Sequence, residues 1–300
     1  MLTPVLAIKA DVDTYAGTRD NVPRLLGIFE RFGVRATFYF SMGPDNSGKS
    51  IRRIFTQKGF LRKALRTRAL SACSFKTMLY GTFLPPPLIA SSFPEILLET
   101  EQRGHEVGIH SWDHVKWQDL LPWFPKPVTA MELGKAGSQF ERIFGRRAGT
   151  TAAPGWIVTQ DALEVQDAMG LDYCSDCRGG HPFYPVIDGR RFRTLQIPTT
   201  WPTMDEIFGG TGVSAEAINN HYLSLLRPGL NVHNIHAEIE GGRQSELFVD
   251  LLERLTAAGV RFITLSEAAE EFGPLSPDCT LEMGELAGRG GKVAIQRCRS

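Results

Sequence analysis

Two histidines, His110 and His114, stand four positions apart in the segment His110-Ser111-Trp112-Asp113-His114. Residues at this spacing share one face of a helix, so both imidazoles can reach the same divalent ion. The same pair can also be structural, packed beside Trp112 and Trp117. The spacing alone therefore leaves a metal site and a structural pair open.

Two carboxylates, Asp11 and Asp13, end an apolar stretch near the start of the chain. In an extended segment residues i and i+2 share a face, so both acids can point into one cavity. Carboxylates are costly in apolar surroundings unless they bind a cation or move protons. The alternative is that Asp13 caps the next turn while Asp11 is solvated. Two histidines and one aspartate would leave a coordination position for water, as catalytic zinc-type sites do.

A third histidine, His236, follows the apolar segment 231–235. An imidazole titrates near neutral pH, so His236 is a candidate general acid, although a histidine at a strand end can also be structural. Asp176 is a candidate carboxylate partner that would orient it. The nearby Cys174-x-x-Cys177 spacing has no second such pair, and we interpret it as incidental.

Apolar β-branched segments alternate along the chain with amphipathic segments that have helix-start and helix-stop signals. The predicted strands are 5–10, 34–40, 106–109, 231–236 and 260–265, with short extended pieces near 150, 172 and 195. The predicted helices are 21–32, 94–103, 128–144, 160–169, 214–226 and 243–258. Repeated β-then-α units predict parallel strands with helices outside, as an open sheet or a barrel. Such folds place their chemistry at the carboxyl ends of strands, where all five candidate residues fall.

The segment 46–94 interrupts this alternation, because it has no acidic residue and nine basic ones interleaved with apolar side chains. This composition suits an anionic membrane surface, and a solvated basic loop packed on the fold is the alternative. The candidate membrane-contact residues are Arg52, Arg53, Phe55, Arg62 and Lys63.

Composition excludes several classes of protein. The 33 basic and 33 acidic residues give a formal net charge of zero, which argues against a nucleic-acid-binding polycation. No secretory signal is expected, and prolines and glycine in 77–94 argue against a membrane-spanning helix there. Five scattered cysteines predict no disulfide framework and favour a reducing compartment. The Gly- and Pro-rich segment 274–300 is expected to be disordered.

Taken together, these motifs resemble the polysaccharide deacetylase (NodB-homology) family. The resemblance rests on Asp11-Val12-Asp13, His110-x-x-x-His114, the turn Pro154-Gly155-Trp156 and Ile235-His236, and it spans about residues 5–272. It implies a metal-dependent N-deacylase on a distorted (β/α)7-type barrel, over residues 1–273, with the basic insertion after the second strand.

One branch is more similar: the 4-deoxy-4-formamido-L-arabinose-phosphoundecaprenol deformylases of lipid A modification, a pathway of resistance to polymyxin and cationic peptides. The further matching stretches are 17–19, 43–46, 105–108, 175–179, 196–198 and 235–238. This resemblance implies an undecaprenyl-phosphate-linked sugar substrate and a peripheral location at the cytoplasmic face of the bacterial inner membrane. A deacetylase of N-acetylated polysaccharide and a non-catalytic sugar-lipid binding protein are the alternatives.

Carried over by resemblance, Asp13, His110 and His114 would bind a divalent ion of the zinc, cobalt or manganese type. Asp11 would be the general base and His236 the general acid. A backbone N–H near Gly155 or Trp156 would stabilise the oxyanion, with Arg178 as a further candidate for substrate contact. The broad family has an Arg before the Pro-containing turn, where this chain has Thr151-Ala152-Ala153, so the partner of Asp11 stays open between Arg178 and Arg19.

Overall fold

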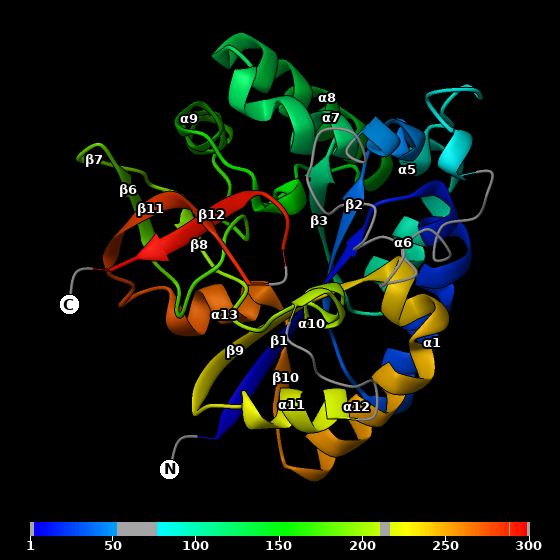
Figure 1. Ribbon diagram of the computed structural model, residues 1–300, viewed down its shortest axis with the longest axis vertical. Helices are drawn as coiled ribbons and strands as arrows, with labels where there is room; N and C mark the ends of the chain where they lie inside the picture. Colours follow the sequence, from blue (N-terminus) through cyan, green and yellow to red (C-terminus); the bar gives the residue numbers. More distant parts are fainter. Residues whose placement is uncertain (1–2, 53–76, 211–216, 288, 299–300) are drawn as a thin grey trace.

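A parallel sheet forms the centre of the computed structural model, which describes residues 3–52, 77–210, 217–287 and 289–298 (Figure 1). Its strands lie in the order β10-β1-β2-β3-β4-β5-β8, β9 also pairs with β1, and all these pairings are parallel. The strands are β1 Pro4–Val12, β2 Thr37–Ser41, β3 Glu106–Ser111, β4 Thr150–Thr151, β5 Tyr173–Cys174, β8 Leu195–Gln196, β9 Gly229–His236 and β10 Arg261–Ile263. The sheet curls into a half barrel, which confirms the predicted α/β class.

Helices connect the strands and cover the outside of the sheet (Figure 1). They are α1 Val22–Phe32, α5 Ile89–Ser92, α6 Pro94–Gln102, α7 His114–Leu120, α8 Lys126–Phe144, α9 Gln160–Met169, α10 Met204–Gly210, α11 Ile218–Ser224, α12 Ser245–Ala257 and α13 Leu265–Phe272. Their ends follow local signals. Helix α1 has Pro23 in its first turn and ends at Gly33, whose φ of 62° suits glycine. Helix α13, which the sequence analysis does not predict, begins at a capping box of Thr264 and Glu267.

The two faces of β1 pack into different cores, because side chains alternate along a strand. Leu6, Ile8, Ala10 and Val12 belong to the cluster that also contains the apolar faces of α1 and α12. Val5 and Ala7 belong to a second cluster, on the inner side of the curled sheet. By the same alternation Lys9, Asp11 and Asp13 face this inner side. The inner face thus changes from apolar to charged towards the carboxyl end of the strand.

A second sheet stands beside the half barrel, in the strand order β12-β11-β6-β7 (Figure 1). These strands are β6 Tyr184–Ile187, β7 Arg190–Arg191, β11 Asp278–Glu285 and β12 Lys292–Arg297. The expectation of a disordered segment 274–300 is therefore wrong. Period-two burial of Cys279 and Leu281 on β11 anchors the hairpin in the core, together with Ala294 on β12. Cys279 and Cys298 form a disulfide, which also corrects the expectation about the cysteines, whereas Cys174 and Cys177 are free and buried.

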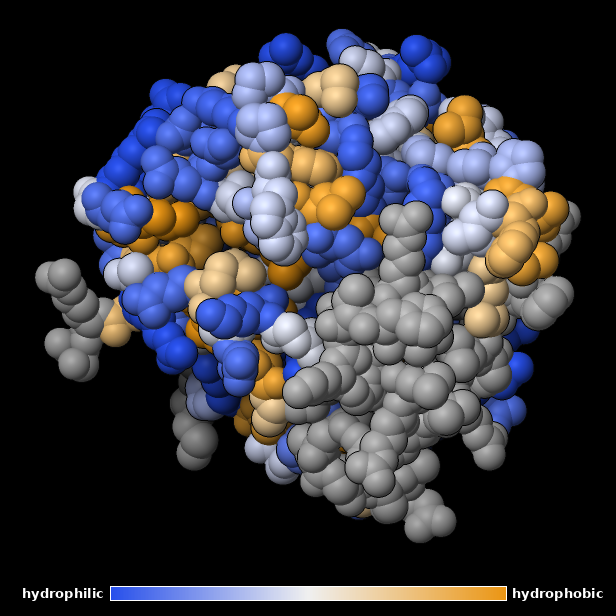
Figure 2. All heavy atoms as spheres, turned by 45° about the horizontal axis from the view of Figure 1, so that its top comes forward, coloured by the Kyte–Doolittle hydropathy of each residue, from blue (hydrophilic) through white to orange (hydrophobic). Residues whose placement is uncertain are grey.

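The basic insertion lies mostly outside the described residues. Arg52 ends a short 3₁₀ helix, η2 Ser47–Arg52, and the chain is next described from η3 Thr77–Leu79 onward. The candidate membrane-contact residues Arg53, Phe55, Arg62 and Lys63 fall between them. Within the described part, no helix combines the length and the apolarity that crossing a bilayer demands. Figure 2 shows one face of the molecule, on which hydrophobic residues form small patches among hydrophilic ones.

Candidate metal and catalytic site

The five predicted chemical residues come from the ends of three strands of the parallel sheet, β1, β3 and β9. Asp11 lies on β1 and Asp13 directly follows it, His110 lies on β3, and His114 begins α7 just beyond β3. His236 ends β9, where the β1–β9 ladder pairs it with Asp11. Parallel strands bring their carboxyl ends to one edge, which is why positions far apart in the sequence meet here.

Asp13 joins both histidines of the candidate metal set. Its two carboxylate oxygens lie 3.2 Å from His110 Nε2 and 3.4 Å from His114 Nε2. One ligand atom from each of the three residues can be chosen so that all lie within 4.8 Å of one another. Burial alone would raise the pKa of Asp13, but the two histidines outweigh it and hold the pKa well below its usual range. An anionic carboxylate facing two imidazoles is a donor set that suits a divalent cation.

The second nitrogen of His110 fixes the orientation of its ring. His110 Nδ1 lies 2.8 Å from the carbonyl oxygen of Ala152, which can only accept a hydrogen bond. The Nδ1 atom therefore carries a proton, and in the neutral ring the lone pair is on Nε2, which faces Asp13. His114 is held by the start of α7, where Asp113 caps the helix by accepting a hydrogen bond from the Lys116 N–H. The types and the closeness of these three side chains therefore fit a metal ion.

Asp11 is 5% exposed and has two polar neighbours on the inner face of the sheet. Asn234 Nδ2 donates to its Oδ2 at 2.9 Å, and Lys9 Nζ lies 4.0 Å from its Oδ1. Lys9 is 1% exposed and donates to the carbonyl oxygen of Ser175 at 2.8 Å. Burial lowers the pKa of Lys9, while Asp11 and Asp176 raise it. The buried cation beside the predicted base is thus Lys9, and not either of the two predicted arginines.

His236 is surrounded by carboxylates. Its backbone N–H donates to Glu240 Oε2 at 2.9 Å, while its Nδ1 makes no hydrogen bond within the described part of the chain. Burial lowers the pKa of His236, but Asp13, Asp205 and other carboxylates raise it to about 9. An imidazole with that pKa holds a proton at neutral pH, as a general acid must.

Two predicted residues have other partners than expected. The carboxylate of Asp176 accepts hydrogen bonds from Gln166 at 2.8 Å and Gln196 at 3.1 Å, whereas His236 Nδ1 makes no hydrogen bond among the described residues. This corrects the expectation that Asp176 orients His236.

Arg178 also has other partners than expected, because every nitrogen of its guanidinium donates a hydrogen bond within the protein. Its Nη1 lies 2.8 and 2.7 Å from the two oxygens of Glu206. It is thus a buried cation whose charge is paired with Glu206. Arg19, the other candidate partner of Asp11, pairs with Asp20 on the surface.

The predicted oxyanion turn, η5 Pro154–Trp156, offers one of its two candidate donors. The Trp156 N–H donates to the carbonyl oxygen of Ala153 at 3.0 Å, so it is already used within the turn. Gly155 has a φ of 63°, and a Cβ there would lie 2.6 Å from the Gln118 side chain. Glycine is therefore required, and the close contact places the turn against α7, one helical turn from His114.

Three residues near the site were not singled out from the sequence: Lys9, Asn234 and Glu238. Glu238 Oε1 accepts hydrogen bonds from the backbone N–H groups of Asp13 and Thr14 at 3.1 and 2.9 Å, which fixes the turn that presents Asp13. Burial, and then the charge of Asp13, raises the pKa of Glu238 to about 7. The alternation of side chains along a strand could have identified two of them. Lys9 shares one face of its strand with Asp11 and Asp13, and Asn234 shares one face of its strand with His236.

A cavity of about 430 Å³ is lined in part by residues 15–19, the segment that follows Asp13 in the chain. Its lining combines aromatic, apolar and cationic side chains. The lining residues are Tyr15, Ala16, Arg19, Thr77, Tyr80, Leu84, Pro85 and Pro87. The cavity therefore lies between the start of α1 and the segment that follows the basic insertion.

Comparison with solved structures identifies the fold. A Mycobacterium smegmatis structure assigned to the polysaccharide deacetylases has a TM-score of 0.64 at 19% identity, covering 95% of this chain and 96% of that one. The peptidoglycan deacetylase PdaC of Bacillus subtilis has a TM-score of 0.53 at 16% identity, covering 89% and 91%. These likenesses confirm the predicted NodB-type (β/α)7 architecture.

Sequence comparison identifies the family. The Shewanella sediminis protein named "Probable 4-deoxy-4-formamido-L-arabinose-phosphoundecaprenol deformylase ArnD" is 36% identical over 292 residues, which is 97% of this chain and 94% of the relative. A Wigglesworthia glossinidia brevipalpis protein of the same name is 28% identical over 284 residues, 94% and 98% of the two chains. The family model described as "Polysaccharide deacetylase" matches residues 11–174. The sequence match, the fold and the candidate site residues at the strand ends all agree. The chain belongs to the polysaccharide deacetylase family, in the branch that holds these deformylase relatives.

Proposed function

We propose that this protein is a metal-dependent deformylase. It would hydrolyse the formamide of undecaprenyl-phosphate-linked 4-deoxy-4-formamido-L-arabinose to the 4-amino sugar and formate, in the aminoarabinose modification of lipid A. The observation that carries the proposal is the pairing of Asp11 with His236 across β1 and β9, directly beside the set of Asp13, His110 and His114. The relatives named as deformylases match the chain over nearly its whole length.

Asp13, His110 and His114 would hold the divalent ion. Bound there, the ion supplies a Lewis acid for the formamide oxygen and lowers the pKa of water. Two nitrogens and one oxygen leave coordination positions open, which distinguishes a catalytic site from a closed structural one. Zinc, cobalt and manganese types all accept this donor set.

Asp11 is the general base of the proposal. Its Oδ2 accepts from Asn234, whereas its Oδ1 is buried without a hydrogen-bond partner in the described part of the chain. That oxygen is available to take a proton from the attacking water. Lys9 Nζ lies 4.0 Å from this oxygen and supplies a buried positive charge beside the base.

His236 and Gly155 complete the reaction on the leaving side. Attack on the formyl carbon develops negative charge on the carbonyl oxygen, and the Gly155 N–H would donate to it. His236 then gives its proton to the nitrogen of the amide, so that the amine leaves as a neutral group and formate is released. The base and the acid would act from adjacent strands, β1 and β9.

The substrate's lipid locates the enzyme. A polyprenyl chain stays in the bilayer, so we infer a peripheral position at the cytoplasmic face of the inner membrane, contacted by the basic segment 46–94. The cavity lined by Tyr15, Arg19 and Tyr80 would accept the sugar and the phosphate. Flotation with vesicles of anionic lipid tests the contact: if a chain lacking 53–76 floats as well as the full chain, the membrane role of this segment is wrong.

Formate release from the lipid-linked 4-formamido sugar tests the reaction. Protein stripped of metal should release no formate, and returning Zn²⁺, Co²⁺ or Mn²⁺ should restore it. Acetate release from an N-acetylated oligosaccharide is measured in parallel on the same preparations. Folded, metal-loaded protein that releases acetate but no formate would replace the proposal with a polysaccharide deacetylase, and release of neither would leave a sugar-lipid binding protein.

A further inference from the structure

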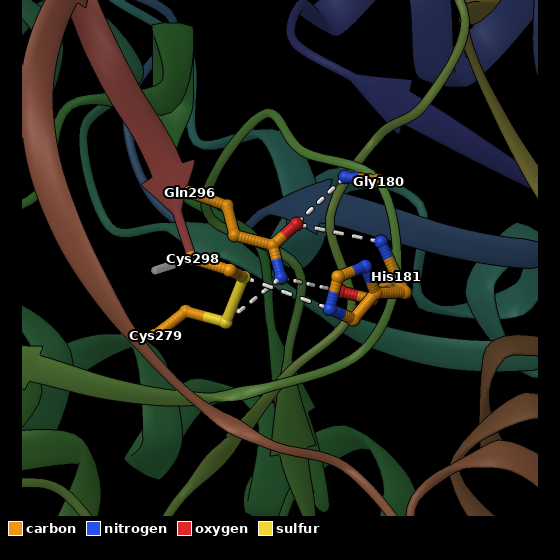
Figure 3. The surroundings of a disulfide bond; sticks show 5 residues. All are labelled: Gly180, His181, Cys279, Gln296 and Cys298. Atoms are coloured by element: carbon orange, nitrogen blue, oxygen red, sulfur yellow. Dashed lines mark hydrogen bonds between the residues drawn. A yellow bond between two sulfur atoms is a disulfide. The ribbon is translucent and has the colours of Figure 1, made fainter. Parts of the chain in front are cut away.

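A second group of metal-ligating side chains lies outside the catalytic site, where the C-terminal strand meets the loop before β6. It consists of His181, Cys279 and Cys298, whose ligand atoms all lie within 4.8 Å of one another (Figure 3). Cys279 is 2% exposed, whereas His181 and Cys298 are on the surface. His181 Nε2 lies 3.6 Å from Cys298 Sγ. One imidazole nitrogen thus stands at contact distance from the disulfide.

One buried side chain, Gln296, holds the backbone around His181 in place beside this group. Its Oε1 accepts a hydrogen bond from the Gly180 N–H at 2.7 Å, and its Nε2 donates to the carbonyl oxygen of His181 at 3.0 Å (Figure 3). The same Nε2 lies 3.6 Å from Cys279 Sγ. A Cβ on Gly179 would come within 2.5 Å of Gln296, so the loop fits closely against β12. Gln296 therefore fixes the backbone of His181 beside both sulfurs, whichever redox state these have.

We propose that reduction of the Cys279–Cys298 disulfide converts this group into a binding site for Zn²⁺, with the two thiolates and His181 Nε2 as ligands. A dithiol reduces the disulfide: two thiols form in the protein, and the dithiol becomes a cyclic disulfide. Each cysteine then loses its proton to solvent when the metal binds. Two thiolates and one imidazole are the soft donors that select zinc, and water takes the fourth position of the tetrahedron.

Distances of the required size are already present. Zinc bonds of about 2.3 Å to sulfur and about 2.0 Å to nitrogen in a tetrahedron separate neighbouring ligands by roughly 3.5–3.8 Å. The Cys298 Sγ to His181 Nε2 distance of 3.6 Å falls in this range. The two sulfurs must move apart, and Cys298 can do so because it follows the last residue of β12 on the surface. In a reducing compartment the thiol form is the expected one, so the metal would replace the disulfide as the link between β11 and β12.

The catalytic set provides an internal contrast, because Asp13, His110 and His114 contain no sulfur. Cobalt bound to thiolate gives a near-ultraviolet charge-transfer band that cobalt bound to nitrogen and oxygen does not. Wild-type protein is reduced with a dithiol, freed of it by anaerobic gel filtration and titrated with Co²⁺, beside the same protein left oxidised. The expected result is a thiolate–cobalt band in the reduced sample alone, and uptake of one more equivalent of Zn²⁺ than in the oxidised sample.

Substitutions assign the ligands. Cys298→Ser should abolish the band, and His181→Ala should weaken Co²⁺ binding by about ten-fold or more. Cys177→Ala is the matched control, because this buried cysteine is not in the group, and it should keep the band. No band in reduced wild type, or a band that survives in Cys298→Ser, would overturn the proposal. The comparison of oxidised with reduced wild type requires no substitution, so the outcome does not depend on a variant that folds.

Discussion

At the scale of single residues, the site is organised around the alternation of β1, which places Lys9, Asp11 and Asp13 on one face. Asp13 faces the two histidines, while Asp11 is paired with Asn234 and Lys9. The two aspartates therefore have different neighbours although they are only two positions apart. Substitutions can therefore distinguish a metal ligand from a general base. Loss of a ligand should release the ion, whereas loss of the base should lower turnover while the ion is retained.

Replacing Asp11 by Asn tests this division of roles. The metal set is untouched, so we expect the variant to retain its ion while turnover falls about 10²-fold or more, the usual effect of losing a general base. Metal content by mass spectrometry and formate release are measured on the same sample. A variant that loses its metal would make Asp11 a ligand instead.

Replacing Lys9 by Met tests the cation beside the base. The substitution keeps the length of the side chain and removes its charge, leaving the Asp11 carboxylate buried without it. We expect kcat to fall roughly 10- to 100-fold, the range for residues that support a reactive group, with KM and metal content nearly unchanged. A rise in KM with unchanged kcat would show that Lys9 acts on substrate binding.

At the scale of the elements, the turn that carries Gly155 must be compact because α7 lies against it. We expect Gly155→Ala to lower both stability and kcat, since the new Cβ displaces Gln118 or the turn itself. Gly145→Ala is the matched control: Gly145 also has a positive φ, of 67°, but no described atom lies within 4 Å of such a Cβ. Backbone strain of about 1–3 kcal/mol is common to both. Equal losses of stability in urea unfolding, with kcat retained, would show that the contact with α7 is unimportant.

His105 connects the turn before β3 to the turn before β2, and it does so as a neutral ring. Its Nδ1 accepts a hydrogen bond from the Ala36 N–H at 3.1 Å, and burial, with Arg103 and Arg35 nearby, lowers its pKa to about 4. A pKa below the unfolded value of about 6.5 means that the folded state binds fewer protons. The contribution of His105 to the free energy of unfolding is complete above pH 6.5 and is lost as the pH falls from there towards 4.

The pH dependence of unfolding checks this contribution. Between pH 7 and pH 4.5 the wild type should lose roughly 2 kcal/mol more stability than His105→Asn, whose amide oxygen can still accept from Ala36 but does not titrate. Urea unfolding at both pH values measures the difference. Parallel losses in the two proteins would contradict the assignment.

Part of this architecture is predictable from sequence because it depends on local patterns. The predicted strand ends identified Asp11, Asp13, His110, His114 and His236, because the periodicity of strands and helices can be recognised in the sequence without knowledge of tertiary contacts. No local pattern reveals the contacts of Lys9, and only the folded sheet shows that its ammonium reaches Ser175 and Asp11. Arg178 was assigned to substrate, because nothing local reveals a pairing with Glu206 28 positions away.

At the scale of the whole molecule, the C-terminal hairpin is a part of the fold rather than an appendage. Val293 and Ile295 on β12 pack against Trp156, beside the oxyanion turn, and the backbone of Arg178 pairs with the same strand. Glycines obscured these strands in the sequence, although the period-two spacing of Cys279 and Leu281, and of Val293 and Ile295, was visible.

Removal of residues 274–300 should therefore destabilise the enzyme. Exposing several apolar side chains that are now buried is expected to lower the Tm by about 10 °C or more, with loss of formate release. Leu275→Ser in the full chain is the control, because that side chain is 95% exposed and should change neither quantity. A truncated chain with the wild-type Tm would return the segment to the status of a dispensable tail.

The threefold pairing of β1 has a consequence for how the chain is made. Its partners include β9 and β10, near the other end of the sequence, and Asn234 reaches Asp11 across 223 positions. A ribosome must therefore release residues up to about 263 before the first strand can be enclosed. Asp13 and the two histidines are all synthesised before residue 115, so a nascent chain carries the candidate metal ligands long before His236, the proposed general acid. Until β9 and β10 have been synthesised, the apolar strand β1 has an edge without a partner strand. Slow or interrupted translation is therefore the stage at which this protein is most exposed to aggregation.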